Sequence, residues 1–251
     1  GVGKLAKAEP DGYTVGIGQW STHVVNPVTY EVPYDIVKDF EPIALIANTP
    51  QLIIARKDFP AKDVKELVAW LKANPDKATA ATVGVAGGAQ VSAVYFQKET
   101  GTTFRFVPYR GGGPAVTDMM AGQVDLMFDQ AANALGPVKG GSIKAYAVMS
   151  KERWAPLPDV PSIDESGTPG LYVAYWHAMW APKGTPKEVI AKLNAAVVHA
   201  LADPGTRKRL AEIGQDVWPR EQQTPEALAA FHKAEIEKWW PIIRASGLRA
   251  Q

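Results

Sequence analysis

The sequence predicts an α/β protein of two lobes. Strand-like and helix-like segments alternate over most of its 251 residues, which favours mainly parallel strands connected by helices. The last third departs from this alternation and consists of three consecutive predicted helices. The length fits one large domain or two lobes, and an apolar share of 46% supplies a sizeable core.

The first two thirds of the chain supply the strands. A turn at residues 10–12 precedes a short strand at residues 13–17. Short apolar runs predict further strands at residues 43–46, 51–55, 79–83, 104–107, 124–128 and 143–149. Val64, Leu67, Val68 and Leu71 recur at helical spacing, and a second helix spans residues 91–99 before Gly101.

Capping signals open the helices of the last third. Residues 185–188 (TPKE) predict a capping box, and Asp203-Pro204 and Thr224-Pro225 predict two further helix starts. Gly214 and Gly247 predict the ends of those two helices. We expect residues 176–182 to return the chain to the first lobe. Lobe one then comprises residues 1–55 and 177–251, and lobe two comprises residues 56–176.

Composition removes several classes of function. The chain has 27 Lys and Arg against 26 Asp and Glu, so its net charge does not indicate binding to nucleic acid or to an anionic membrane. The absence of cysteine excludes thiol nucleophiles, disulfides and thiolate metal sites. The four histidines are too scattered to predict a metal site, and we place His199 and His232 on helix surfaces. Because no complete nucleotide fingerprint is present either, we expect no cofactor.

The most informative stretch is residues 107–115 (VPYRGGGPA), followed by residues 122–129 (GQVDLMFD). It predicts a strand, a glycine turn, a short helix and a strand. Pro114 suits the first turn of a helix, and Gly122 suits the position just after its end. A glycine run before a helix leaves backbone N–H groups bare, which favours an anion-binding site.

Four loops follow predicted strands at the position where α/β proteins bind ligands. They are rich in Gly, Ser, Thr, Asn or Gln, which offer neutral hydrogen bonds to a polar ligand. The plainer alternative is that the glycines only permit tight turns. The candidate ligand-binding residues are Gln19, Trp20, Ser21, Thr22, Val85, Ala86, Gly87, Gly88, Gln90, Tyr109, Arg110, Gly111, Gly112, Asp129 and Asn133.

No pair of residues predicts catalysis. The sequence has neither a G-x-S-x-G elbow nor an S-x-x-K motif. Asp125 and Asp129 lie at the two ends of one predicted strand, too far apart for acid–base work. Asp129 is expected to accept N–H bonds or to orient a ligand. Arg110 either pairs with a carboxylate or is a solvated surface residue, and the Trp20 ring could stack on a ligand.

A series of short motifs occurs in order along nearly the whole chain. They include AEPDGYT at residues 8–14, KDFEP at 38–42, VPYRG at 107–111, GQVD at 122–125, LPDVP at 157–161, ESG at 165–167 and APKGTP at 181–186. The series closely resembles the extracytoplasmic solute receptors of the tripartite tricarboxylate transporter system, called the Bug or TctC family.

This resemblance implies a two-lobed periplasmic binding protein fold of type II, the Venus-flytrap kind. It implies an exported, periplasmic receptor, expected to be a monomer. The receptor would hold a di- or tricarboxylate or an aromatic acid between its lobes and deliver it to membrane permease subunits, without catalysis. We expect the family's first β-α segment to precede residue 1. Two alternatives from the residues stay open: a sensor of the same fold, and a transferase that uses the glycine loops as an oxyanion site.

Overall fold

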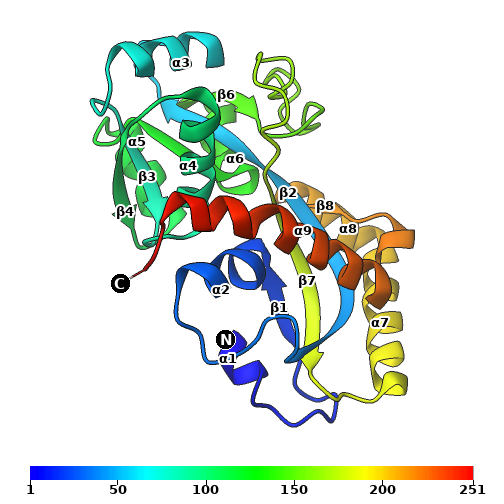
Figure 1. Cartoon of the computed structure of the whole chain (residues 1–251). Coiled ribbons are helices and arrows are strands. Elements are labelled where there is room, and N and C mark those ends of the chain that lie inside the picture. Colours follow the sequence, from blue (N-terminus) through cyan, green and yellow to red (C-terminus); the bar gives the residue numbers. More distant parts are fainter. Residues whose placement is uncertain (251) are drawn as a thin grey trace. The chain divides into compact units, whose positions relative to one another are not determined.

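The computed structural model describes residues 1–250 and is a mixed α/β fold (Figure 1). By its internal contacts the chain divides into two compact units. Unit 1 comprises Gly1–Asn48 and the C-terminal part from Tyr175, and unit 2 comprises Thr49–Ala174. The chain passes between them within strands β2 (Phe40–Arg56) and β7 (Ala174–Pro182). The boundaries expected from the sequence, after residues 55 and 176, lie within the same two strands.

Unit 1 contains β1 (Gly16–Gln19), most of β7, the first half of β2 and the short β8 (Asp216–Val217). β1 pairs with β7 in antiparallel register, and β8 pairs with β2 at Ala47 and Asn48. The helices of unit 1 are α1 (Val2–Leu5), the π-helical turn Ser21–Val25, α2 (Asn26–Thr29), α7 (Lys187–Ala202), α8 (Pro204–Glu212), the 3-10 turn Arg220–Gln222 and α9 (Pro225–Ser246).

The C-terminal helices confirm most of the predicted capping. Asp203 accepts a hydrogen bond from the Thr206 N–H at 2.7 Å, and Thr224 Oγ1 accepts one from the Ala227 N–H at 3.1 Å. Gly247 ends α9 with a φ of +69°, a left-handed conformation that glycine adopts without strain. The capping box at residues 185–188 was wrong. α7 begins after Pro186, because the Thr185 hydroxyl instead donates backwards to the Pro182 carbonyl at 2.8 Å.

Unit 2 is built on five strands in the order β6-β2-β5-β3-β4. Its further strands and helices are α3 (Val64–Ala73), β3 (Thr79–Val83), α4 (Gly88–Thr100), β4 (Arg105–Tyr109), α5 (Gly112–Met120), β5 (Leu126–Gln130), α6 (Ala131–Lys139) and β6 (Ile143–Val148). β3 is parallel to both β4 and β5, whereas β2 is antiparallel to β5 and β6.

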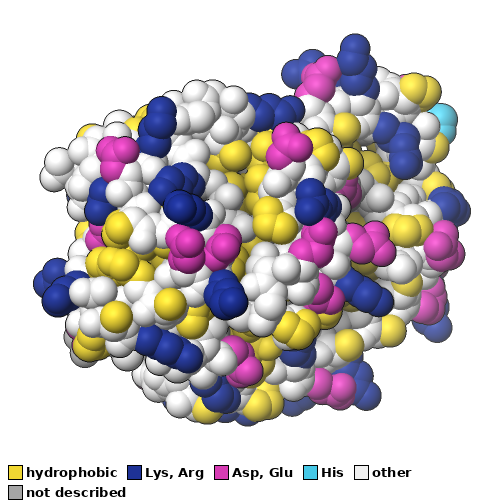
Figure 2. Space-filling view, turned by 90° about the horizontal axis from the view of Figure 1, so that it is seen from above, with side chains coloured by type: hydrophobic (Ala, Val, Ile, Leu, Met, Phe, Trp, Pro, Cys, Tyr) yellow, Lys and Arg dark blue, Asp and Glu magenta, His cyan; other side chains and the backbone are white. Residues whose placement is uncertain are grey.

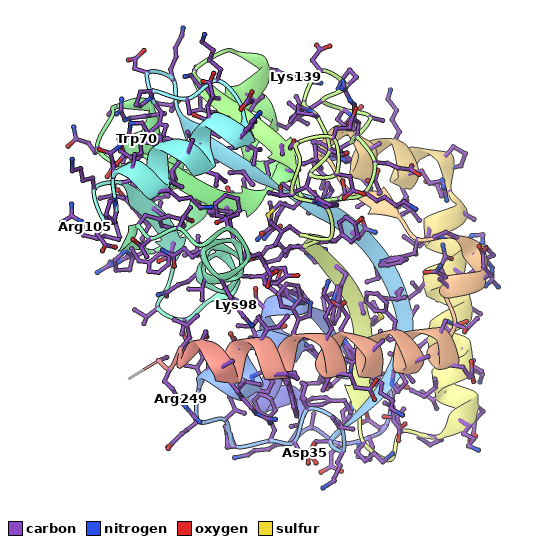
Figure 3. All side chains as sticks on the ribbon, turned by 45° about the horizontal axis from the view of Figure 1, so that its top comes forward. Asp35, Trp70, Lys98, Arg105, Lys139 and Arg249 are labelled. Carbon is purple, nitrogen blue, oxygen red and sulfur yellow. The ribbon has the colours of Figure 1, made fainter. Side chains whose placement is uncertain are left out.

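Apolar packing covers both faces of the unit 2 sheet. On one face, Leu52, Ile54 and Met127 join residues of α5 and α6 in a single buried cluster. On the other, Phe128 contacts Phe96 of α4, with ring centroids 5.2 Å apart. At the α3 side, Trp70, which Figure 3 labels, packs edge-on against Phe59. A sheet buried on both faces explains why its strands read as continuous apolar runs.

Three expectations about the strands need correction. The strand expected at residues 13–17 starts at Gly16, because Asp11 forms a turn to the Tyr13 N–H at 2.9 Å. The strands expected at residues 43–46 and 51–55 are one strand. Pro50 falls between the β8 ladder, which ends at Asn48, and the β5 ladder, which begins at Gln51. Pairing is mixed and not mainly parallel, because alternation reveals the order of elements but not the direction of each strand.

Asp125 ties three strands of unit 2 together just before β5. Its Oδ1 accepts from Arg56 Nε at 2.8 Å, and its Oδ2 accepts from the Thr79 N–H at 2.8 Å and the Thr79 hydroxyl at 3.0 Å. All of these groups are partly buried. This end of β5 is opposite to the end that carries Asp129, which confirms that the two aspartates are held apart.

We expect Asp125→Ala to lower the free energy of unfolding by about 2–4 kcal/mol, because it leaves both the Arg56 guanidinium and the Thr79 N–H without the carboxylate that accepts their hydrogen bonds. Urea unfolding measures the loss. Since residue 125 lies at the far end of the strand from the ligand loops, ligand affinity measured on the folded variant should be unchanged. A loss below 0.5 kcal/mol (roughly the scale of a neutral surface change) would contradict this role.

Charges of both signs are interspersed on the face that Figure 2 displays, as the near-zero net charge suggests. Within residues 1–250, no helix combines the length and the apolar character that crossing a membrane requires.

Candidate ligand-binding site

Three strands of unit 2 end at the same edge of the sheet. β3 runs parallel to β4 with Val83 opposite Tyr109, and β3 also runs parallel to β5. Parallel strands end together, so the loops after β3, β4 and β5 meet at one edge. Each strand is followed directly by a helix, respectively α4, α5 and α6. This is the place in an open α/β sheet where ligands bind.

The three helices begin without a side-chain cap. Their N-cap residues are Gly87, Gly111 and Gln130, and none of these makes a side-chain capping hydrogen bond to its helix. By contrast, Asp63, Asp203 and Thr224 cap α3, α8 and α9, while α7 also starts uncapped. Bare N–H groups and the positive end of the helix dipole both favour a bound anion. Three such helix starts at one edge are suited to a carboxylate.

The loop between β3 and α4 has a constrained backbone. Ala86 adopts a φ of +55°, which is uncommon for a residue other than glycine. The Gln90 side chain holds the turn, since its Oε1 accepts the Ala86 N–H at 2.7 Å. A Cβ at Gly87 would collide with the Val83 carbonyl, so glycine is required there. Val85 is exposed and Gly88 is buried. Strained backbone of this kind is concentrated at functional sites.

The loop between β4 and α5 brings glycine close to polar side chains. Tyr109 is half-buried, and its hydroxyl donates to Asp118 Oδ2 at 3.0 Å. Arg110 is exposed. A Cβ at Gly112 would lie 3.0 Å from Asn133 Nδ2 and 3.5 Å from Asp129 Oδ2. The start of α5 therefore lies directly beside the end of β5.

Asp129 is the most unusual side chain at this edge. It is 4% exposed, and its Oδ1 accepts from the Gln130 N–H at 2.8 Å and from Asn133 Nδ2 at 3.2 Å. Its Oδ2 is buried without a hydrogen-bond partner. Burial raises the pKa of Asp129 to about 6, against the two hydrogen bonds, which lower it.

A second buried polar side chain at this edge was missed in the sequence. Gln51 of β2 lies opposite Gln130 of β5 and is fully buried. Neither its Oε1 nor its Nε2 has a hydrogen-bond partner. Buried amides normally have partners, so this one marks a polar location within the core. The available signal was a glutamine that opens the apolar run QLIIA at residues 51–55.

The remaining predicted residues belong to unit 1. Gln19 lies opposite His177 in β1, and its N–H donates to Thr22 Oγ1 at 3.0 Å. Ser21 is half-buried. Trp20 is fully buried and makes edge contacts with Tyr175 and Trp239, at ring centroid distances of 5.3 and 4.9 Å. Its ring therefore has no exposed face on which a planar ligand could stack.

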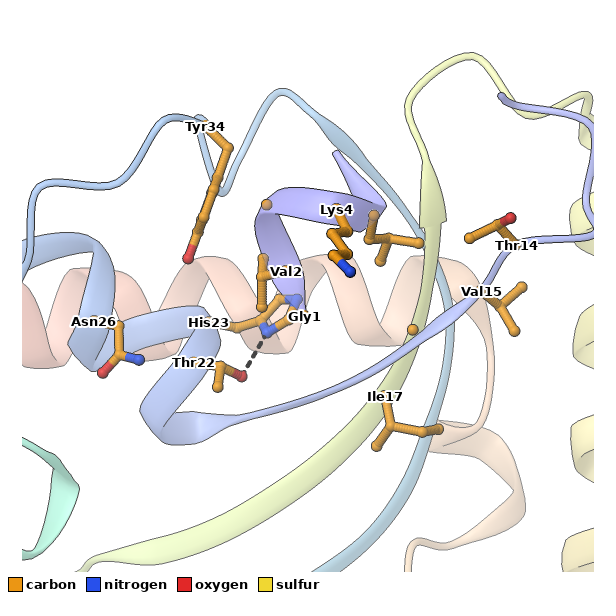
Figure 4. A pocket seen from close by; sticks show the side chains of 13 residues that line it. Gly1, Val2, Lys4, Thr14, Val15, Ile17, Thr22, His23, Asn26 and Tyr34 are labelled. Carbon is orange, nitrogen blue, oxygen red and sulfur yellow. Dashed lines mark hydrogen bonds between the residues drawn. The ribbon is translucent and has the colours of Figure 1, made fainter. Parts of the chain in front are cut away.

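A pocket of about 590 Å³ opens beside Thr22 in unit 1 (Figure 4). His23, Asn26 and Tyr34 also line it, and Thr22 Oγ1 lies 3.0 Å from His23 Nδ1. Burial, and then the neighbouring His232, lower the pKa of His23 to about 3, so this imidazole is neutral.

The surface position expected for His232 was wrong. It is 5% exposed, and its Nε2 lies 2.8 Å from the His23 carbonyl oxygen.

The structure thus brings the unit 2 candidates together at one sheet edge, whereas Gln19, Trp20, Ser21 and Thr22 lie in unit 1. Within residues 1–250, no group of three or more His, Asp or Glu side chains is arranged to hold a metal ion. The edge in unit 2 offers backbone donors and amides, which suit the binding of an anion.

Comparison with known sequences gives a consistent family. The family model of the tripartite tricarboxylate transporter family receptor matches residues 1–248. A protein of Agrobacterium vitis from the ttuE-ttuC' intergenic region is 36% identical over 98% of this chain and 71% of its own length. BugT of Bordetella pertussis is 28% identical over 99% of this chain and 76% of its own length.

Solved structures agree in fold. The periplasmic binding protein BugD superposes with a TM-score of 0.89 at 38% identity, over 100% of this chain and 84% of its own. MatC of Rhodopseudomonas palustris with bound malate superposes with a TM-score of 0.88 at 36% identity, over 96% of this chain and 83% of its own. A further R. palustris protein, solved with adipate, superposes with a TM-score of 0.88 at 30% identity, over 99% of this chain and 82% of its own. The fold is that of the two-lobed periplasmic binding proteins, and the chain belongs to the receptor family of the tripartite tricarboxylate transporters.

Proposed function

We propose that this protein is an exported periplasmic receptor, acting as a monomer, which captures a small organic carboxylate and delivers it to the membrane permease of a tripartite transporter. One observation carries the proposal: three uncapped helix starts meet at the carboxyl edge of the unit 2 sheet. Relatives similar over almost the whole chain were solved with malate and adipate, both dicarboxylates.

The chemistry of this edge favours an anion held by neutral donors. The N–H groups at the starts of α4, α5 and α6 supply hydrogen bonds, and the helix dipoles supply partial positive charge. Neither contribution requires a Lys or Arg side chain. Asn133 adds an exposed amide at the same place. Because no catalytic pair of titratable groups lies at this edge, we assign it to retention of the ligand and not to its conversion. Capture between two lobes, as expected from the sequence, stays a prediction.

A thermal-shift panel of mono-, di-, tri- and aromatic carboxylates tests the proposal. We expect at least one acid to raise the melting temperature, because a ligand that binds only the folded state stabilises it by mass action. At a hundred times its Kd the gain is about 2.7 kcal/mol, or roughly 5–10 °C for a chain of this size. Inorganic chloride at equal ionic strength is the control. If no acid shifts the transition beyond chloride, the carboxylate assignment fails.

A further inference from the structure

The Asp129 carboxyl lies next to the anion-binding helix starts of unit 2. Its Oδ2 is 3.5 Å from the place where a Gly112 Cβ would be, and Gly112 is the first residue of α5. The same position is 3.0 Å from Asn133 Nδ2, in the first turn of α6. The side chain is 4% exposed, and Oδ2 has no hydrogen-bond partner. An unpaired carboxylate oxygen and the expected ligand carboxylate are thus neighbours.

Two carboxylates at such a site do not remain ionised together. Like charges in a water-poor location disfavour the doubly charged state, so one of the two groups gains a proton. A ligand anion has several N–H donors at the helix starts, whereas Asp129 Oδ2 has none. The proton is therefore more stable on Asp129 than on the ligand.

The charged groups of the surrounding elements do not offset this repulsion. The titratable side chains on β4, α4, α5, α6 and the unit 2 part of β2 are Arg105, Tyr109, Tyr95, Lys98, Glu99, Asp118, Lys139 and Arg56, and the exposed Arg110 lies in the loop between β4 and α5. Arg105 and Lys139 are exposed at the outer surface of unit 2 (Figure 3). Arg56 is bonded to Asp125 at the other end of the strand, and Tyr109 to Asp118. The pKa shift of Asp129 has burial as its largest cause, and none of its causes is a neighbouring charge.

We propose that Asp129 takes up one proton from solvent when the unit 2 edge binds a carboxylate, so that the complex contains the ligand anion beside a neutral Asp129 side chain. This inference rests on the proposed function and adds that ligand binding at the same site depends on pH. In the free protein the pKa of Asp129 is about 6, so the side chain is mostly ionised at neutral pH and the proton has to come from the buffer. Binding therefore strengthens as the pH falls, with a slope of at most about one proton per site.

Isothermal titration calorimetry with malate and with adipate tests the inference. Titrations at about pH 6.5 and about pH 8.5 keep both probes ionised, while Asp129 of the free protein becomes more completely ionised at the higher pH. We expect the Kd to rise roughly tenfold between the two conditions. Two buffers of different ionisation enthalpy, used at the same pH, should give enthalpies whose difference corresponds to proton uptake. The number of protons taken up on binding is thus measured on the wild-type protein alone.

Asp129→Asn supplies the matched variant. The amide keeps an oxygen that can accept from the Gln130 N–H and places an uncharged NH₂ where Oδ2 was. We expect its affinity to be the same at both pH values and close to that of the wild type at the lower one. Asp118→Asn, which removes a carboxylate on the neighbouring helix α5, should retain the wild-type pH dependence.

The outcomes separate this inference from the proposed function. Binding without pH dependence and without proton uptake overturns the inference but leaves the receptor intact. A pH dependence that persists in Asp129→Asn also overturns it. If neither malate nor adipate binds at either pH, while other acids of the panel bind, the titrations are repeated with the strongest panel acid under the same criteria. If no acid binds at all, the proposed function fails, and the inference fails with it.

Discussion

Replacing Gly111 with valine is expected to weaken carboxylate binding at least about a hundredfold, a loss of about 2.7 kcal/mol. Gly111 is the N-cap of α5, where a side chain reaches the N–H groups of the first helical turn. An isopropyl group there covers these donors and blocks the approach of an anion. Calorimetric titration of the best panel acid into both proteins measures the loss.

The same substitution should leave the fold intact, which makes the result a test of binding. The backbone at Gly111 is extended, with a φ of −176°, which any residue adopts. A Cβ there would meet only Pro114 Cδ, at 4.0 Å. Gly136→Val is the matched control, because a Cβ at Gly136 within α6 meets open space away from the helix start. Unchanged affinity in Gly111→Val would place the ligand elsewhere.

Local signals in the sequence were sufficient for most helix ends, the start of α7 excepted, and for the loops after the strands. Asp203, Thr224, Gly101 and Gly247 act within one turn of themselves, so their roles follow from near neighbours alone. The same holds for the glycine turn before α5, with Pro114 in the first turn and Gly122 at a φ of +75°. These signals were sufficient to predict which loops follow strands β3, β4 and β5.

What the sequence did not reveal depends on contacts between distant segments. The single β2 strand is continuous because its two halves pair with different partners on either side of Pro50. His232 is buried because it packs against His23, more than two hundred residues away. The unpaired Oδ2 of Asp129 arises from the packing of α5 and α6 on the end of β5. Periodicity and propensity contain no information on such long-range enclosure.

Trp20 directly follows β1 at the start of the π-helical turn, and its ring is enclosed in the core and not available for the stacking that the sequence suggested. We expect Trp20→Ala to lower the free energy of unfolding by about 3–5 kcal/mol, because it opens a cavity in the core of unit 1. The indole is fully buried and contacts the Tyr175 and Trp239 rings edge-on. Edge contacts of this kind add to the loss of buried area. Urea unfolding followed by circular dichroism measures the change.

Trp20→Phe distinguishes packing from any polar contribution. The Trp20 Nε1 is buried without a hydrogen-bond partner, so its removal leaves no acceptor unpaired. Phenylalanine keeps an aromatic ring beside Tyr175 and Trp239, and we expect it to cost about 1–2 kcal/mol, well below the alanine variant. Equal losses for the two variants would contradict the packing argument. Affinity measured on folded Trp20→Phe should stay within about threefold of the wild type, because a ring enclosed by protein acts on the ligand only through the fold.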